Sequence, residues 1–429
     1  MNSGAGGPGN EHSDSAHRGS RNSPNRRNRA APGPTRSNQV ASDHYLSFTG
    51  GHSARKKREQ ASETRLLLFA FVRAPAYNSR PLLSGRTESR RQDLSVPKLT
   101  GSRTRLVIHD LSRRNGQANF AADVLSGLSA TPKHLFAKYL YDELGSQLFE
   151  AICRVDEYYL TRAESEILSR HADEIISLAP ACETLVELGS GSAEKTRKLI
   201  EALLRQRAEL LFVPVDISAS ALEKSSRSLL ESYPSLRISA YAADYFEGLA
   251  ALKPLDVGPM LVLFLGSNIG NFEKDEAANF LRAIRGMLKS GDALLLGADL
   301  KKDRATLEAA YNDSLGVTRA FIVNELARIN RELGGNFDLW AFGLRSVYNE
   351  EAGCVEVYLE SLRSQSVNIR RLDLTISFAA GERMHMENSY KYSVDDLARM
   401  ATESGFELTS TWLDDQKRFS SNLLIASNE

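Results

Sequence analysis

CETLVELGSGSAEKTRKLIEALL, residues 182–204, is the most informative stretch of this sequence for its architecture. An apolar strand leads into a turn with two glycines, and an amphipathic helix follows. Gly189 and Gly191 let the backbone turn tightly and let a ligand approach without a Cβ in the way. A lone turn of this kind is often only structural, so its neighbours must show whether it binds a ligand.

Position 194 narrows the choice of ligand. A dinucleotide-binding turn has a third glycine there and holds a pyrophosphate at the helix N-terminus, whereas this chain has Glu194. A carboxylate beside a pyrophosphate costs Coulomb energy, while S-adenosylmethionine has no phosphate and carries an ammonium and a sulfonium group. The turn therefore favours S-adenosylmethionine as cofactor over a nicotinamide dinucleotide.

Polar residues recur at the C-terminal ends of further apolar segments, which are 209–218 (ELLFVPVDIS), 236–246 (LRISAYAADYF), 259–272 (PMLVLFLGSNIGNF) and 292–300 (DALLLGADL). Asp216 can accept hydrogen bonds from both ribose hydroxyls of a nucleoside, and Asp244 with Tyr245 can bind and cover its adenine ring. An Asp at a strand end is often only a helix cap. Open parallel sheets bind ligands at these strand ends, so the repetition favours a binding site.

The alternation of strands with helices predicts an α/β fold with a Rossmann-like parallel sheet over residues 166–300. Two late segments, 405–415 and 418–429, predict an antiparallel hairpin at the sheet edge, an ending common in class I methyltransferases, so 392–429 completes the sheet. Residues 301–391 leave the alternating pattern, with one long helical stretch over 304–332 and strand-like segments after it. We expect an inserted α+β substrate-recognition lobe there, which residues 105–165 join.

The first 104 residues hold 18 Lys and Arg against 7 Asp and Glu, and the rest of the chain is acidic on balance. Their Ser, Asn, Arg, Gly and Pro content with few aromatics predicts a disordered basic tail. A solvated tail, a start codon placed too far upstream and a targeting segment all fit this composition. The acidic body argues against nucleic acid as a partner, and no apolar run reaches the roughly 20 residues that cross a bilayer.

Cys153, Cys182 and Cys354 lie far apart and show neither metal-ligand spacing nor a disulfide framework. We therefore expect no metal site and a reducing compartment. We also expect a cytoplasmic, monomeric enzyme that acts on small molecules and has no membrane or nucleic-acid partner. Phenols and carboxylates after Thr131 suit an ammonium or imidazole ligand, although tyrosines in a helix-rich segment are more often packing residues.

From about Ser129 to its end, the chain resembles the histidine-specific N-alpha-methyltransferases of ergothioneine biosynthesis. The motifs that carry the resemblance are YDELGSQLFEAI (141–152), DEYYLTRAE (156–164), ELGSGSAEKT (187–196), FLGSNIGNF (264–272), AYNDSLGVT (310–318), INRELGGNFD (329–338) and LTISFAAGERMHMENSYKY (374–392). The first and last are much more specific than the glycine turn. The resemblance implies S-adenosylmethionine-dependent methylation of the alpha-amino group of L-histidine, up to three times, which gives hercynine.

The resemblance also implies roles for individual residues. The cofactor positions are Gly189, Lys195, Asp216, Asp244 and Tyr245, with Gly191 beside them in the turn and Tyr245 in place of a more usual Phe. Tyr158, Asn271 and Tyr311 match the positions that hold the amino acid's carboxylate and amino group. Tyr141 matches a further pocket tyrosine near the amine. We expect Tyr141, Tyr158 and Asn271 to be the catalytic set, because they present the amine to the methyl group.

Glu387 and Ser389 match the pair that recognises imidazole, where one acceptor and one hydroxyl satisfy the two ring nitrogens. Val357 falls where the family usually carries a methionine, and a smaller residue there enlarges the pocket. Val357 therefore leaves open a methyltransferase of the same fold that acts on another amino acid or small amine. A non-catalytic protein that binds S-adenosylmethionine and a nicotinamide oxidoreductase are more distant alternatives.

Overall fold

The computed structural model describes residues 104–111, 116–179, 182–252 and 258–427 of the 429-residue chain. The tail predicted over residues 1–104 lies outside the described residues, except for Thr104. Within the described residues, no helix is both long enough and apolar enough to cross a membrane.

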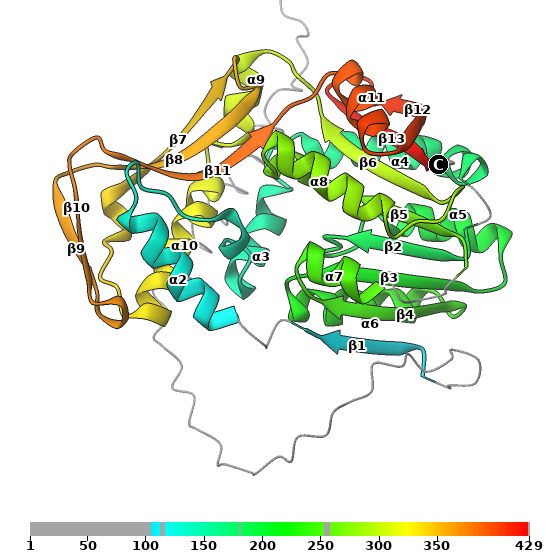
Figure 1. The fold of residues 1–429 in the computed structure, drawn as a ribbon, viewed down its shortest axis with the longest axis horizontal. Helices are drawn as coiled ribbons and strands as arrows, with labels where there is room; N and C mark the ends of the chain where they lie inside the picture. Colours follow the sequence, from blue (N-terminus) through cyan, green and yellow to red (C-terminus); the bar gives the residue numbers. More distant parts are fainter. Residues whose placement is uncertain (1–103, 112–115, 180–181, 253–257, 428–429) are drawn as a thin grey trace, which may run out of the picture. The chain divides into compact units, whose positions relative to one another are not determined.

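The main sheet has the strand order β1-β4-β3-β2-β5-β6-β13-β12 (Figure 1). Its strands are β1 (Leu106–Asp110), β2 (Thr184–Leu188), β3 (Leu210–Asp216), β4 (Leu236–Ala242), β5 (Met260–Phe264), β6 (Ala293–Asp299), β12 (Phe406–Leu413) and β13 (Phe419–Ala426). Neighbours from β1 to β6 are parallel, and β13 runs antiparallel between β6 and β12. The predicted parallel sheet and its terminal hairpin are confirmed.

Helices cover both faces of this sheet, which is why its central strands are continuous apolar runs. The helices are α4 (Leu160–Leu178), α5 (Arg197–Gln206), α6 (Ala219–Ser232), α7 (Tyr245–Leu252), α8 (Lys274–Arg285) and α11 (Val394–Glu403). Alternate residues of a strand face opposite sides: Leu185 joins the core under α4, α5 and α6, whereas Val186 joins the core under α7, α8 and α11. The two packed layers hold the strand ends, and the loops that follow them, in place.

One boundary of the predicted substrate lobe is wrong. Residues 106–110, which the sequence analysis assigns to that lobe, form β1 and pair in parallel with β4, from Leu106 opposite Ile238 to Asp110 opposite Ala242. β1 is an edge strand of five half-buried or exposed residues, so its sequence lacks the apolar run that marks the inner strands.

The remaining elements, apart from η3 in the loop after β5, follow the predicted α+β lobe, with one break. They are α2 (Gly116–Ser129), η2 (Ala137–Tyr139), α3 (Glu143–Ile152), η3 (Asn268–Asn271), α9 (Arg304–Ala310), α10 (Val317–Leu333), η4 (Leu339–Ala341), β7 (Phe342–Asn349), β8 (Cys354–Ser361), β9 (Gln365–Ile369), η5 (Arg370–Leu372), β10 (Leu374–Phe378) and β11 (Arg383–Tyr390). Strands β11, β8 and β7 form one antiparallel sheet, β10 and β9 another, and α3 packs against α10.

The single helical stretch predicted over 304–332 is wrong, because the chain turns between α9 and α10. Gly316 adopts a left-handed conformation with φ +76°, which favours glycine. The Asp313 carboxylate accepts hydrogen bonds from the backbone of Val317 at 3.0 Å and Thr318 at 2.6 Å, so it satisfies donors in the first turn of α10. The break leaves Tyr311 at the C-terminal end of α9.

Candidate active site

The glycine turn after β2 is packed closely by two other elements. Gly189 has φ +79°, and a Cβ on it would lie 2.8 Å from the Asn268 side-chain nitrogen and 2.9 Å from the Tyr245 hydroxyl oxygen. Only glycine fits a backbone that is both left-handed and this close to side chains. The turn, η3 and the start of α7 therefore meet at one point, where the sequence analysis places a cofactor.

Asp216 ends β3 and Asp244 follows β4, and both carboxylates accept hydrogen bonds from the backbone. Asp216 accepts hydrogen bonds from the backbone N–H of Gly191 at 2.8 Å and of Ser218 at 2.9 Å, and burial raises the pKa of its carboxyl. Each oxygen keeps a second lone pair for a ribose hydroxyl. Asp244 is exposed and caps α7 by accepting from the Glu247 backbone at 2.8 Å.

Lys195 is held by a carboxylate that the sequence analysis did not single out. Glu164 on α4 is fully buried, pairs with the Lys195 ammonium and accepts the Gly266 backbone N–H at 2.9 Å on both oxygens. Burial disfavours the charge on Lys195, but the Glu164 carboxylate outweighs it and raises the pKa of the ammonium. Lys195 is thereby fixed beside the loop after β5.

One cavity brings together the six residues that the sequence analysis assigns to the substrate. Its lining includes Tyr141, Tyr158, Asn271, Tyr311, Glu387 and Ser389. Gly266 and Asn268 also line it, and Asn268 is the residue next to Gly189. The cavity thus connects the predicted substrate positions with the predicted cofactor turn. Asn268 was missed, although it lies in the glycine-containing loop GSNIGNF that the sequence analysis quotes.

Aromatic rings form one wall of this cavity. Tyr141 contacts Phe149 and Phe321 edge-on, with ring centroids 5.5 Å and 5.3 Å apart, and Tyr158 contacts Tyr311 at 6.2 Å. Burial raises the pKa of Tyr141 and Tyr158 well above the ordinary value. Both phenols therefore stay protonated at neutral pH and act as hydrogen-bond donors or acceptors rather than as phenolate bases.

Strand β11 supplies the polar end of the cavity. Glu387 and Ser389 are two residues apart, so their side chains lie on the same face of the strand. The register of β11 against β8 shifts between His385 and Glu387, and Glu387 then lies opposite Val357. Burial raises the pKa of Glu387 to about 7, and the Ser389 hydroxyl lies 2.7 Å from that of Tyr311.

Val357 is fully buried and is not among the residues that line the cavity in the described part of the chain. The expectation that Val357 itself lines the side-chain pocket is therefore wrong. Val357 lies opposite Glu387 in the pairing of β8 with β11, and Glu387 lines the cavity.

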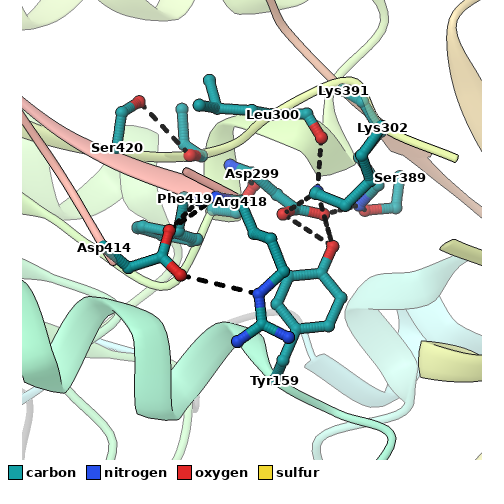
Figure 2. Close-up of polar contacts among 12 residues, drawn as sticks. Tyr159, Asp299, Leu300, Lys302, Ser389, Lys391, Asp414, Arg418, Phe419 and Ser420 are labelled. Carbon is teal, nitrogen blue, oxygen red and sulfur yellow. Dashed lines mark hydrogen bonds and ion pairs between the residues drawn. The ribbon is translucent and has the colours of Figure 1, made fainter. Parts of the chain in front are cut away.

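A buried charged cluster behind the cavity escaped the sequence analysis (Figure 2). Asp299 at the end of β6 is fully buried and accepts from the Tyr159 hydroxyl at 2.8 Å and 2.9 Å, from Lys302 at 2.7 Å and from Lys391 at 3.1 Å. Asp299 is the last residue of β6, and a polar residue at the C-terminal end of a strand is the same signal that pointed to Asp216. Lys391 gave no such signal, because a lysine near a strand end is usually solvated.

A parallel sheet with an antiparallel terminal hairpin, a glycine turn after β2 and a carboxylate at the end of β3 is the arrangement of a class I methyltransferase. The chain belongs to the family described as histidine-specific methyltransferase, SAM-dependent, whose family model matches residues 120–426. Membership confirms the predicted resemblance and the S-adenosylmethionine cofactor, and it makes the chain an enzyme rather than a binding protein or a nicotinamide oxidoreductase.

The chain is similar to named relatives over most of its described length. The histidine N-alpha-methyltransferase of Mycolicibacterium smegmatis is 43% identical over 305 residues, which are 71% of this chain and 94% of that protein. The histidine N-alpha-methyltransferase of Mycobacterium tuberculosis is 41% identical over 317 residues, 74% of this chain and 98% of that protein. Ergothioneine biosynthesis protein 1 of Neurospora crassa is 32% identical over 324 residues, 74% of this chain but 36% of that protein.

Proposed function

We propose that this enzyme transfers methyl groups from S-adenosylmethionine to the alpha-amino group of L-histidine, up to three times, and so forms hercynine for ergothioneine biosynthesis. The observation that carries the proposal is that Tyr158, Asn271, Tyr311, Glu387 and Ser389 line the same cavity. It offers hydroxyl and amide groups for an amino acid's backbone and a carboxylate with a hydroxyl for its ring.

The residues around the glycine turn suit the cofactor. Gly189 leaves room that a Cβ would fill, and Asp216 has lone pairs left for ribose hydroxyls. Lys195 and Glu164 fix the adjoining loop. When bound, S-adenosylmethionine supplies an electrophilic methyl group.

The protein's part in the reaction is mainly positioning. The amine would have to be held beside the turn around Gly189 and Asp216, where bound S-adenosylmethionine would supply the methyl group that the amine nitrogen accepts. Tyr158, Asn271 and Tyr311 would hold the carboxylate and amine in that place, with Tyr141 beside them. The buried phenols of Tyr141 and Tyr158 remain protonated, so they do not serve as phenolate bases for the amine's proton.

The test is mass spectrometry of the purified protein with S-adenosylmethionine and a mixture of the twenty amino acids. We expect histidine to gain up to three methyl groups and the other amino acids to remain unmodified. Methylation of another amino acid instead would keep the chemistry and contradict the assignment of Glu387 and Ser389. Cofactor binding without any methylated amino acid would contradict the proposed substrate class.

A second candidate function is methylation of another amino acid or small amine. It rests on Val357, which lies opposite Glu387 and is smaller than a methionine.

We also propose a cytoplasmic monomer. What supports the compartment is that Cys153, Cys182 and Cys354 are all free thiols.

A further inference from the structure

A buried lysine lies behind two of the proposed substrate-binding hydroxyls. The Lys391 ammonium donates hydrogen bonds of 2.8 Å to the Tyr311 hydroxyl oxygen and 2.8 Å to the Ser389 hydroxyl oxygen, and it pairs with Asp299 at 3.1 Å. The side chains of Lys391 and Asp299 are both 0% exposed. Figure 2 shows Lys391 between Ser389 and the Asp299 carboxylate. Burying two charges is costly, so the pair invites a functional explanation.

Asp299 keeps Lys391 charged and in place. Its carboxylate is itself anchored by the Tyr159 hydroxyl and by Lys302. Burial disfavours the ammonium of Lys391, but Tyr311 and Asp299 outweigh burial and raise its pKa. An ammonium group has three donors and no acceptor. Lys391 can therefore only donate to the hydroxyls that it contacts.

Because Lys391 can only donate, it fixes the direction of the hydrogen bonds that the Tyr311 and Ser389 hydroxyls make. Both hydroxyl oxygens accept from Lys391, so the hydrogens of Tyr311 and Ser389 must be donated elsewhere. The two hydroxyls are 2.7 Å apart, so one hydrogen is used between them and the other is left for the cavity. A phenol oxygen accepts a second hydrogen bond less readily than an aliphatic hydroxyl, because its ring withdraws a lone pair. Tyr311 therefore donates to Ser389, and Ser389 donates into the cavity.

We propose that Lys391 is a positioning residue that makes Ser389 a hydrogen-bond donor toward the substrate ring. The inference rests on the proposed function, in which Glu387 and Ser389 face an imidazole. With Glu387 as acceptor and Ser389 as donor, the pair matches the neutral ring, which has one N–H and one nitrogen lone pair. Without Lys391, the Ser389 hydroxyl rotates to donate to Tyr311, and the donor toward the ring is lost.

Lys302 provides a matched control. It contacts the same Asp299 carboxylate at 2.7 Å and the Tyr159 hydroxyl at 2.6 Å. None of its hydrogen bonds within the described residues reaches Tyr311 or Ser389. Lys302→Met and Lys391→Met therefore remove the same charge from the same carboxylate, but only Lys391→Met releases the hydroxyl pair.

The experiment measures histidine affinity by calorimetry in the presence of S-adenosylhomocysteine, and KM and kcat for histidine, in both lysine variants. We expect Lys391→Met to weaken histidine binding by about tenfold or more, with kcat changed much less, and Lys302→Met to change it by less than about twofold. Equal losses in the two variants would overturn the inference, because the charge alone would then explain them. Wild-type protein that does not methylate histidine would instead refute the proposed function.

A double-mutant cycle separates this role from a merely structural one. If Lys391 acts through Ser389, adding Lys391→Met to Ser389→Ala should cost little beyond the single change. Additive losses would overturn the inference. If Lys391→Met does not fold, Lys391→Gln takes its place in the same cycle and is judged by the same criterion, since its amide can both donate and accept.

Discussion

Glu387 lies directly opposite Val357 in the antiparallel pairing of β11 with β8, and Val357 is fully buried. The proposed ring-binding carboxylate is therefore supported by a small side chain on the neighbouring strand. A residue can change selectivity from this position without lining the cavity, because neighbouring side chains on paired strands pack against each other.

Replacing Val357 with methionine tests this relationship. The longer side chain should overpack the buried site and cost about 1–3 kcal/mol of unfolding free energy. It should also press on Glu387 and narrow the cavity, which raises the preference for histidine over larger amino acids in a competition assay. Val367→Met, the same exchange at a buried valine of β9, should lower stability but leave selectivity unchanged. A selectivity change of equal size in both variants would contradict the prediction.

The pH dependence of catalysis should report Glu387. Burial raises its pKa to about 7, so the carboxylate that accepts the ring N–H is present above pH 7 and is lost as the pH falls through 7. Histidine itself titrates in this range, so the useful quantity is the ratio of kcat/KM between wild type and Glu387→Gln, in which the substrate's titration cancels. We expect the ratio to fall from pH 8 to pH 6. A constant ratio would show that Glu387 does not titrate there.

The two glycines of the turn should differ in their effect on cofactor binding. A methyl group at Gly189 would meet the Asn268 and Tyr245 side chains at 2.8 Å and 2.9 Å, whereas one at Gly191 would meet no atom within 4 Å. Both residues have positive φ, so both alanine variants carry backbone strain of order 1 kcal/mol. Gly189→Ala should weaken S-adenosylmethionine binding by about tenfold or more, as measured by calorimetry, and by more than Gly191→Ala does, because only the Gly189 methyl group also displaces neighbouring side chains. Similar dissociation constants for the two variants would disprove the steric argument.

The parallel sheet was predictable because its strands are buried on both faces and are therefore continuous apolar runs, as in 260–265 and 293–298. The edge strand β1 was not, because none of its five residues is fully buried and its pairing with β4 spans more than 100 positions of sequence. The turn between α9 and α10 was not predictable, because aspartate and glycine are also found inside helices. Only the hydrogen bonds of Asp313 show that a turn forms here.

The site residues that the sequence analysis named at strand ends or in specific motifs lie together around the cavity and the turn. Those it missed, such as Glu164 and Lys391, contact residues of the turn and the cavity but do not line the cavity themselves. Their roles depend on which distant groups the fold brings within hydrogen-bond distance, such as the 102 positions between Glu164 and Gly266. No local pattern carries that information.

Glu164 allows a last test of how the loop after β5 is held. It is fully buried, pairs with Lys195 and accepts the Gly266 backbone N–H on both oxygens. Replacing it with glutamine leaves Lys195 without its counter-charge and turns an amide N–H toward a backbone donor. Loss of a buried partner costs about 3–5 kcal/mol when the remaining charge stays buried, and somewhat less here, because Lys195 is partly exposed.

Glu164→Gln should therefore lower the free energy of unfolding by about 2 kcal/mol or more and weaken S-adenosylmethionine binding. The control is Glu166→Gln two residues along α4, where the carboxylate is partly exposed, pairs with Arg170 at 3.0 Å and accepts the Asp415 backbone N–H at 2.9 Å. Chemical denaturation and calorimetry on both variants decide the question. Because surface ion pairs contribute little, the control should lose less than about 1 kcal/mol and keep its cofactor affinity. Equal losses of stability and of cofactor affinity in the two variants would show that the buried carboxylate does not organise the loop.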